Sequence, residues 1–207
     1  MEKYRHEIFF IASLLNISCC AYPLKALFNL KNQNGPKEFP YEPLKFSYFT
    51  MTAWFCLALQ SGDFEFIAPG LIGTLATIMC LFFYSNTIPK SDYVFQDILY
   101  GMVFILFTYF LPQAVLSFVA CGLTVRLYLF SWSDLQALKL KNNWNWVDSV
   151  EVWLNAWNTV FWVAIGMLDS DFMAILAFLT GLFIYSQILV NYHLVSFRSG
   201  KTKISLD

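Results

Sequence analysis

The segment from 54 to 64 reads WFCLALQSGDF, and the segment from 162 to 172 reads WVAIGMLDSDF. Each begins with tryptophan, ends with Asp-Phe and leads to a glycine nine residues further on, Gly73 in the first copy and Gly181 in the second. The residue numbers of the two segments differ by a constant offset of 108, and Tyr84 and Tyr192 keep the same offset. We interpret this agreement as an internal repeat.

The composition predicts a helical membrane protein. Hydrophobic residues make up 58% of the 207 residues and charged residues only 13%, which is far more apolar than a soluble domain of this length. A net charge of -1 provides no basic surface for nucleic acid, so we expect no nucleic-acid partner. The charged N-terminus leads into a full-length apolar run without a small-residue cleavage site, which predicts a first membrane helix and not a removed signal peptide.

Seven apolar segments are long enough to be membrane-spanning helices, each needing about 20 residues. They are 7–30, 43–60, 66–86, 92–111, 115–138, 148–168 and 172–195. The stretch 94–130 is almost continuously apolar and too long for one span, so we place a tight turn at Pro112-Gln113. If that turn were absent, the count would be six.

Loop charges predict the orientation of these helices. The first, third and fifth connections and the C-terminal tail are basic, whereas the connections 60–65 and 169–171 carry only acidic charge. Basic loops stay on the cytoplasmic side of a membrane. We therefore expect the N-terminus outside and the C-terminus inside. The membrane itself is not identified by the sequence, and an organellar inner membrane is one of the alternatives.

The parity of the helices then defines the fold class. Acidic loops at equivalent places of two three-helix units lie on the same side only if an odd number of helices joins the units. We therefore predict an all-α integral membrane protein with seven transmembrane helices, arranged as two parallel three-helix repeats joined by an inverting helix (3+1+3). The predicted boundaries are 1–90 for the first repeat, 91–113 for the linker helix, 114–198 for the second repeat and 199–207 for a polar tail.

This pattern resembles the SWEET sugar transporters, in the wider clan of PQ-loop proteins. The matching features are Pro23 late in the first helix, a basic loop, a tryptophan before an acidic turn, and Pro69-Gly70 near the start of the third helix. The resemblance covers about residues 8–86 and 116–195. It implies facilitative transport by alternating access between the repeats, without a cofactor.

The resemblance also implies which residues line the substrate path. In the family, an asparagine three residues before the glycine of the third helix lines the central pocket of each repeat, and these positions here are Gly70 and Phe178. Thr52 and Trp162 fall where second-helix pocket residues lie, and Pro23 falls at a hinge. Without the asparagines we expect a pocket poor in hydrogen-bond partners, which favours a small apolar ligand or none. Trp162 also fits a packing or interface role.

Arg126 is a charged residue inside a predicted membrane helix. Burying a guanidinium in hydrocarbon costs at least about 2.5–3.5 kcal/mol, so we expect this side chain to face the bundle interior or a wet cavity. An offset of 110 pairs it with Asn16, which suggests a shared axial cavity. Its partner is either an anionic group of a substrate, or another subunit, or an internal carboxylate. The internal candidates are Asp97, Asp134 and Glu151.

No catalytic or metal-binding pattern is present in the sequence. The five cysteines lie in apolar runs without metal-ligand spacing, and we interpret them as small core residues. The acidic turns around Asp63 and Asp171 are interpreted as helix caps or loop charges. We expect no enzyme activity, no metal and no cofactor.

Two functions remain for such a chain. One is a SWEET-like facilitative transporter whose path is lined by the residues named above: Asn16, Pro23, Thr52, Gly70, Arg126, Trp162 and Phe178. The other is a non-transporting accessory subunit of a larger membrane complex, such as an organellar one, that keeps this fold. The expected partners are the lipid bilayer together with a small-molecule solute, further copies of the chain, or other membrane subunits.

Overall fold

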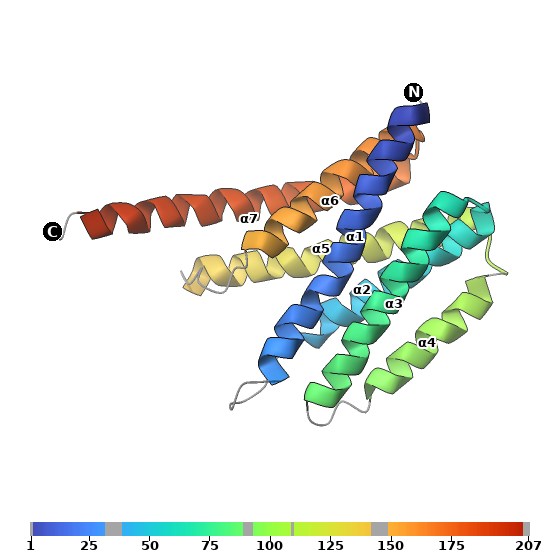
Figure 1. Cartoon of the computed structure of the whole chain (residues 1–207), viewed down its shortest axis with the longest axis horizontal. Helices are drawn as coiled ribbons and strands as arrows, with labels where there is room; N and C mark the ends of the chain where they lie inside the picture. The colour runs from blue at the N-terminus through green and yellow to red at the C-terminus, as the bar shows by residue number, and fades with distance from the viewer. Residues whose placement is uncertain (1, 32–38, 89–92, 109, 142–148, 205–207) are drawn as a thin grey trace.

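The computed structural model describes residues 2–31, 39–88, 93–108, 110–141 and 149–204 (Figure 1). These residues form seven helices and no strand. The helices are α1 (Glu2–Lys31), α2 (Tyr41–Ser61), α3 (Phe64–Thr87), α4 (Tyr93–Thr108), α5 (Gln113–Lys141), α6 (Ser149–Leu168) and α7 (Phe172–Ile204). The expected turn at Pro112-Gln113 is confirmed, because α4 ends before it and α5 begins at its second residue.

The chain is an integral membrane protein. Four helices contain segments long and apolar enough to cross a bilayer, at Tyr4–Asn29, Phe64–Thr87, Gln113–Gln136 and Phe172–Val195. Helix α4 is apolar but shorter, at 16 residues. Helices α2, of 21 residues, and α6, of 20 residues, are not among these four segments.

The helices pack as two equivalent units. In each unit the third helix packs against both the first and the second, as α3 does with α1 and α2, and α7 with α5 and α6. The units meet through α1 with α6 and through α2 with α5. Exchanging the units converts one of these contacts into the other, which is the pattern of a pseudo-two-fold axis. The predicted 3+1+3 arrangement is therefore the arrangement of the fold.

The turn between the second and third helix has the same backbone in both repeats. Gly62 (φ 68°) and Ser170 (φ 57°) are equivalent positions of the repeat, and both have left-handed backbone conformations. The next residue caps the following helix in each case: Asp63 accepts a hydrogen bond from the Glu65 amide, and Asp171 from the Ala174 amide. The capping interpretation of these aspartates is thus confirmed.

Helix α4 attaches to the first repeat by packing on α2 and α3. The Tyr48 hydroxyl donates to the Ile98 carbonyl at 3.0 Å, and the Tyr48 ring occupies the space where Gly101 lacks a side chain. Near the end of α2, the Gln60 amide donates to the carbonyls of Thr108 and Leu111. Only a narrow stripe of α4 is buried, and its remaining apolar surface is exposed.

The repeats converge at one end of the bundle and diverge at the other (Figure 1). The acidic end holds the N-terminus of α1 and the two turns with Asp63, Glu65, Asp169 and Asp171. At the opposite end, here called the loop end, the C-terminal ends of α1 and α3 lie far from those of α5 and α7. The helices of the two repeats therefore lie farther apart at the loop end than at the acidic end (Figure 1).

Candidate functional site

A cavity of about 640 Å³ lies between the two repeats. Tyr22, Pro40 and Glu151 line it near the loop end, and Asp63 and Asp171 line it at the acidic end. Its wall is built mainly by α1 and α2 from the first repeat and by α5 and α6 from the second. The cavity thus follows the interface between the repeats over most of the length of the bundle.

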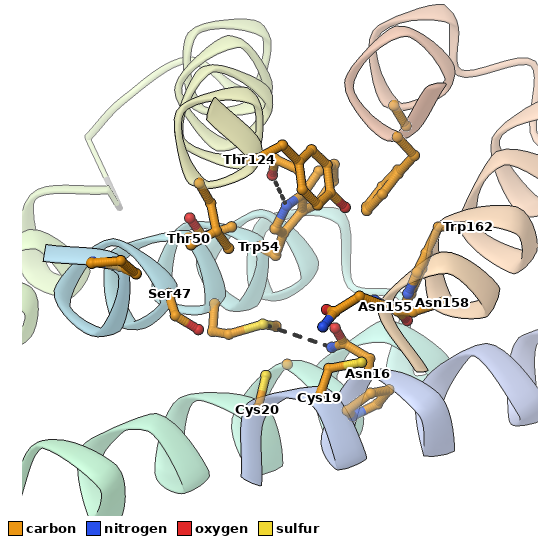
Figure 2. Close-up of a pocket in the computed structure, with 18 of the residues that line it drawn as sticks. Asn16, Cys19, Cys20, Ser47, Thr50, Trp54, Thr124, Asn155, Asn158 and Trp162 are labelled. Carbon is orange, nitrogen blue, oxygen red and sulfur yellow. Dashed lines mark hydrogen bonds between the residues drawn. The ribbon is translucent and has the colours of Figure 1, made fainter. Parts of the chain in front are cut away.

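Helices α2 and α6 present the same pattern to this cavity (Figure 2). Each has two polar side chains three residues apart, followed four residues later by a tryptophan, and this spacing keeps all three on one helix face. The lining residues are Ser47, Thr50 and Trp54 on α2, and Asn155, Asn158 and Trp162 on α6. Each of the three residues on α2 precedes its counterpart on α6 by 108 positions, so the internal repeat includes the wall of the cavity.

Three asparagines converge on one side of the cavity, Asn16 from α1 with Asn155 and Asn158 from α6 (Figure 2). The Asn16 amide has only a weak contact with the Met51 sulfur, at 3.7 Å, and the Asn155 amide donates to the Glu151 carbonyl at 3.0 Å. Asn158 is only 7% exposed, and its carbonyl oxygen has no hydrogen-bond partner. A buried acceptor without a partner costs free energy, and a ligand that donates a hydrogen bond would remove this cost.

An aromatic stack crosses the cavity at the level of the two equivalent tryptophans. The Phe178 ring lies between them, with centroids 5.9 Å from Trp54 and 5.7 Å from Trp162 in stacked orientations. The Trp54 indole nitrogen donates to the Thr124 hydroxyl at 2.9 Å, whereas the buried Trp162 indole nitrogen has no partner. Phe178 therefore occupies the space between the tryptophans and leaves the polar faces of α2 and α6 open to the cavity.

The charged residues that line the cavity are all acidic within the described part of the chain. They are Asp63, Asp134, Glu151, Asp169 and Asp171. A cavity with this charge disfavours an anionic solute, because like charges repel more strongly away from bulk water. Among the described residues, no group of histidine, cysteine, aspartate and glutamate side chains has the arrangement of a metal site.

Arg126 does not have the environment that the sequence suggested. Its side chain is exposed on the outer face of α5 and does not line the cavity. The guanidinium carbon lies 4.7 Å from the centroid of the Phe130 ring and 5.7 Å from that of Phe46. The faces of these aromatic rings stabilise the cation there, and the sequence argument, which weighed only the cost of burial in hydrocarbon, did not include such contacts. The expected inward orientation is therefore wrong.

Of the other residues expected along the path, five line the cavity: Asn16, Pro23, Gly70, Trp162 and Phe178. Thr52 does not, because its side chain is fully buried within the first repeat. Gly70 and Phe178 supply no side-chain hydrogen-bond partner, as the sequence indicated, but the cavity has polar lining residues that the expectation did not include. The missed donors and acceptors lie on α2 and α6, and applying the repeat offset to Ser47 and Thr50 would have found them.

Comparison with solved structures shows which known fold this is. A eukaryotic SWEET transporter superposes with a TM-score of 0.76 over 93% of this chain and 99% of its own length, at 13% sequence identity. The fold is that of a SWEET transporter. No protein-family model matches the sequence, and no curated protein matches it. In this fold the cavity of the chain lies between the two three-helix repeats.

Proposed function

We propose that this chain is a facilitative transporter of a small, neutral, polar solute such as a sugar. The observation that carries the proposal is the cavity between the repeats, with the same polar-polar-tryptophan pattern on α2 and α6. Asparagine and hydroxyl side chains suit a solute with several hydroxyl groups, and tryptophan faces suit its apolar surfaces. The acidic lining supports a neutral solute over an anion.

Transport would proceed by alternating access, with residues 1–90 and 114–198 as the two moving units. The divergence of the repeats at the loop end supports a conformation in which solute enters or leaves from that side. With the orientation that the loop charges indicate, the N-terminus lies outside, and the loop end faces the cytoplasm or a matrix.

The test is uptake of radiolabelled monosaccharides by proteoliposomes containing the purified chain. Asn158→Ala removes the buried acceptor and is expected to reduce uptake at low solute concentration about five- to tenfold, the value of roughly one hydrogen bond. Asn86→Ala is the matched control, because Asn86 is exposed on α3, does not line the cavity and donates to the Phe82 carbonyl of its own helix. Equal uptake by wild type, Asn158→Ala and empty liposomes would contradict the proposal.

One observation favours an accessory subunit as the second candidate. Phe178 fills the space between Trp54 and Trp162, so a solute cannot lie between these rings in this conformation. Such a subunit would keep the fold for its outer surface, which includes the exposed apolar face of α4. Two results together would favour this candidate. One is the absence of uptake both for monosaccharides and for amine-bearing solutes, whose positive charge would suit the acidic lining of the cavity. The other is purification of the chain only as part of a larger assembly.

A further inference from the structure

Arg5 is the only residue that bonds to acidic turns of both repeats within the described part of the chain. Its guanidinium holds the Asp169 carboxylate with two bonds, Nε to Oδ1 at 2.7 Å and Nη2 to Oδ2 at 3.1 Å. A third bond joins Nη1 to the Glu65 Oε2 at 2.6 Å, and the Asp63 carboxylate lies 3.7 Å from Nη2. Two-pronged bonds of this kind are among the strongest that charged side chains form.

These bonds differ in which units they join. Arg5 lies in the first turn of α1 and Glu65 in the first turn of α3, so their bond lies within the first repeat. Asp169 lies in the turn between α6 and α7, so its bonds with Arg5 cross from the first repeat to the second. The two offsets that relate the repeats lead from Arg5 to Gln113 and Val115, neither of which is basic. The Arg5–Asp169 pair, which joins the first repeat to the second, therefore has no equivalent that starts from the second repeat.

An apolar layer lies one helical turn below this ion pair. Phe9 follows Arg5 by four residues on α1, and its ring packs edge-on against Phe66 at 4.6 Å and against Trp162 at 5.8 Å. Phe66 belongs to the first repeat and Trp162 to the second, so this layer also joins the repeats. The ion pair and the aromatic layer together hold α1 against α6 at the acidic end.

We propose that the Arg5–Asp169 pair is a latch that keeps the repeats together at the acidic end and breaks when that end opens. The inference rests on the proposed alternating access, because a latch matters only if the repeats move apart. Arg5 keeps Glu65 as a partner in its own repeat when Asp169 departs, so the guanidinium is not left unpaired. Breaking the latch would then exchange one carboxylate contact for water at a partly exposed site.

Cys19 supplies the probe for this proposal, since it lines the cavity and is partly exposed, whereas the other four cysteines, including the neighbouring lining residue Cys20, are buried. The chain is reconstituted into vesicles, and a membrane-impermeant maleimide is applied from the side of the N-terminus, whose location is read from a protease-cleavable tag. Asp169→Asn is expected to increase the rate of Cys19 labelling at least about fivefold, the effect of a typical coupling between conformations. The Cys19→Ala variant measures background labelling of the buried cysteines.

Glu65→Gln is the matched control, because it also removes one carboxylate bonded to Arg5 but from the same repeat. Its labelling rate is expected to stay at the wild-type value. An unchanged rate in Asp169→Asn, or equal increases in both variants, would overturn the latch. If Asp169→Asn does not purify, Arg5→Lys takes its place. It keeps the charge but loses the two-pronged geometry, so a smaller increase is expected and an unchanged rate again overturns the latch.

Sugar uptake measured on the same vesicles separates this inference from the proposed function. Increased labelling without uptake in any variant would support the latch and contradict sugar transport. Uptake that depends on Asn158 while labelling never changes would support transport and overturn the latch.

Discussion

The two repeats differ in side-chain size at one equivalent position of the cavity wall, which is Gly70 in the first and Phe178 in the second. A side chain at Gly70 would begin 3.0 Å from the Phe55 Cα, so α3 there touches the backbone of α2 and has no room for one. Phe178 is only 8% exposed and fills the gap between two tryptophans. The same fold thus accepts the smallest and a very large residue at matching places, because Gly70 lies against the α2 backbone whereas Phe178 lines the cavity between the repeats.

Removing the larger side chain should have the greatest effect on stability. Phe178→Ala eliminates both ring stacks and is expected to reduce the free energy of unfolding by about 3 kcal/mol, the usual cost of such a truncation in a packed interior. Phe172→Ala on the same helix is the control, since Phe172 is exposed. Thermal unfolding in detergent measures both, and similar midpoints for the two variants would show that Phe178 is not part of a packed core.

The equivalent glycines Gly73 and Gly181 sharpen the comparison. A Cβ at Gly181 would lie 2.5 Å from the Tyr128 ring and 2.8 Å from the Thr159 methyl, whereas one at Gly73 would meet the flexible end of Met51 at 3.1 Å. We expect Gly181→Ala to cost about 1–3 kcal/mol and Gly73→Ala to be close to neutral. The measurement is again the thermal midpoint, and a larger decrease for Gly73→Ala would show that Gly181 is not the more restricted of these two positions.

The equivalent tryptophans should differ by one hydrogen bond. Trp54→Phe removes the bond to the Thr124 hydroxyl and is expected to cost about 1 kcal/mol more than Trp162→Phe, whose indole nitrogen has no partner. Denaturant unfolding of both variants, followed by circular dichroism, gives the difference. Equal costs would mean that the Trp54–Thr124 bond contributes little to stability.

The smallest effects are expected at the two turns. Gly62 and Ser170 share a left-handed backbone, which costs a residue with a side chain roughly 1–2 kcal/mol. Because no atom lies within 4 Å of a Cβ placed on Gly62, Gly62→Ala should cost about 1 kcal/mol through the backbone alone. Ser170→Gly should increase stability by up to about 1 kcal/mol. Shifts of the thermal midpoint with the same sign in both variants would contradict this account.

The sequence predicted the helices well because hydrophobic length and turn chemistry are local properties. The acidic turns, the break at Pro112-Gln113 and the parity of the helices all follow from residues close together in the chain. Predicting the 3+1+3 arrangement also depended on the internal repeat, since a constant offset between the copies identifies which distant segments are equivalent. The termini of the long helices were less predictable, and α7 continues to Ile204, well beyond its expected end at 195.

The site was less predictable because the rotation of each helix about its own axis decides which of its residues face the cavity. Asn16 and Trp162 were found, but nothing local indicates that Thr50 faces the cavity while Thr52, two residues away, is buried in the repeat. The environment of Arg126 depends on Phe46, which is distant in the chain and lies on another helix. The Arg5 contacts were missed for the same reason, since they join three distant segments.

The attachment of α4 to α2 and α3 has a consequence for how the chain could be assembled. With α4 bound to the first repeat, helices α1 to α4 form one packed body and helices α5 to α7 form the other, and the chain passes from the first body to the second between Thr108 and Gln113. Gln60 of the first body bonds to the Leu111 carbonyl in this connection. A cut there would leave the helix contacts of each body complete. A four-helix fragment and a three-helix fragment, encoded by separate genes and inserted independently, therefore have the surfaces needed to rebuild the bundle in the bilayer.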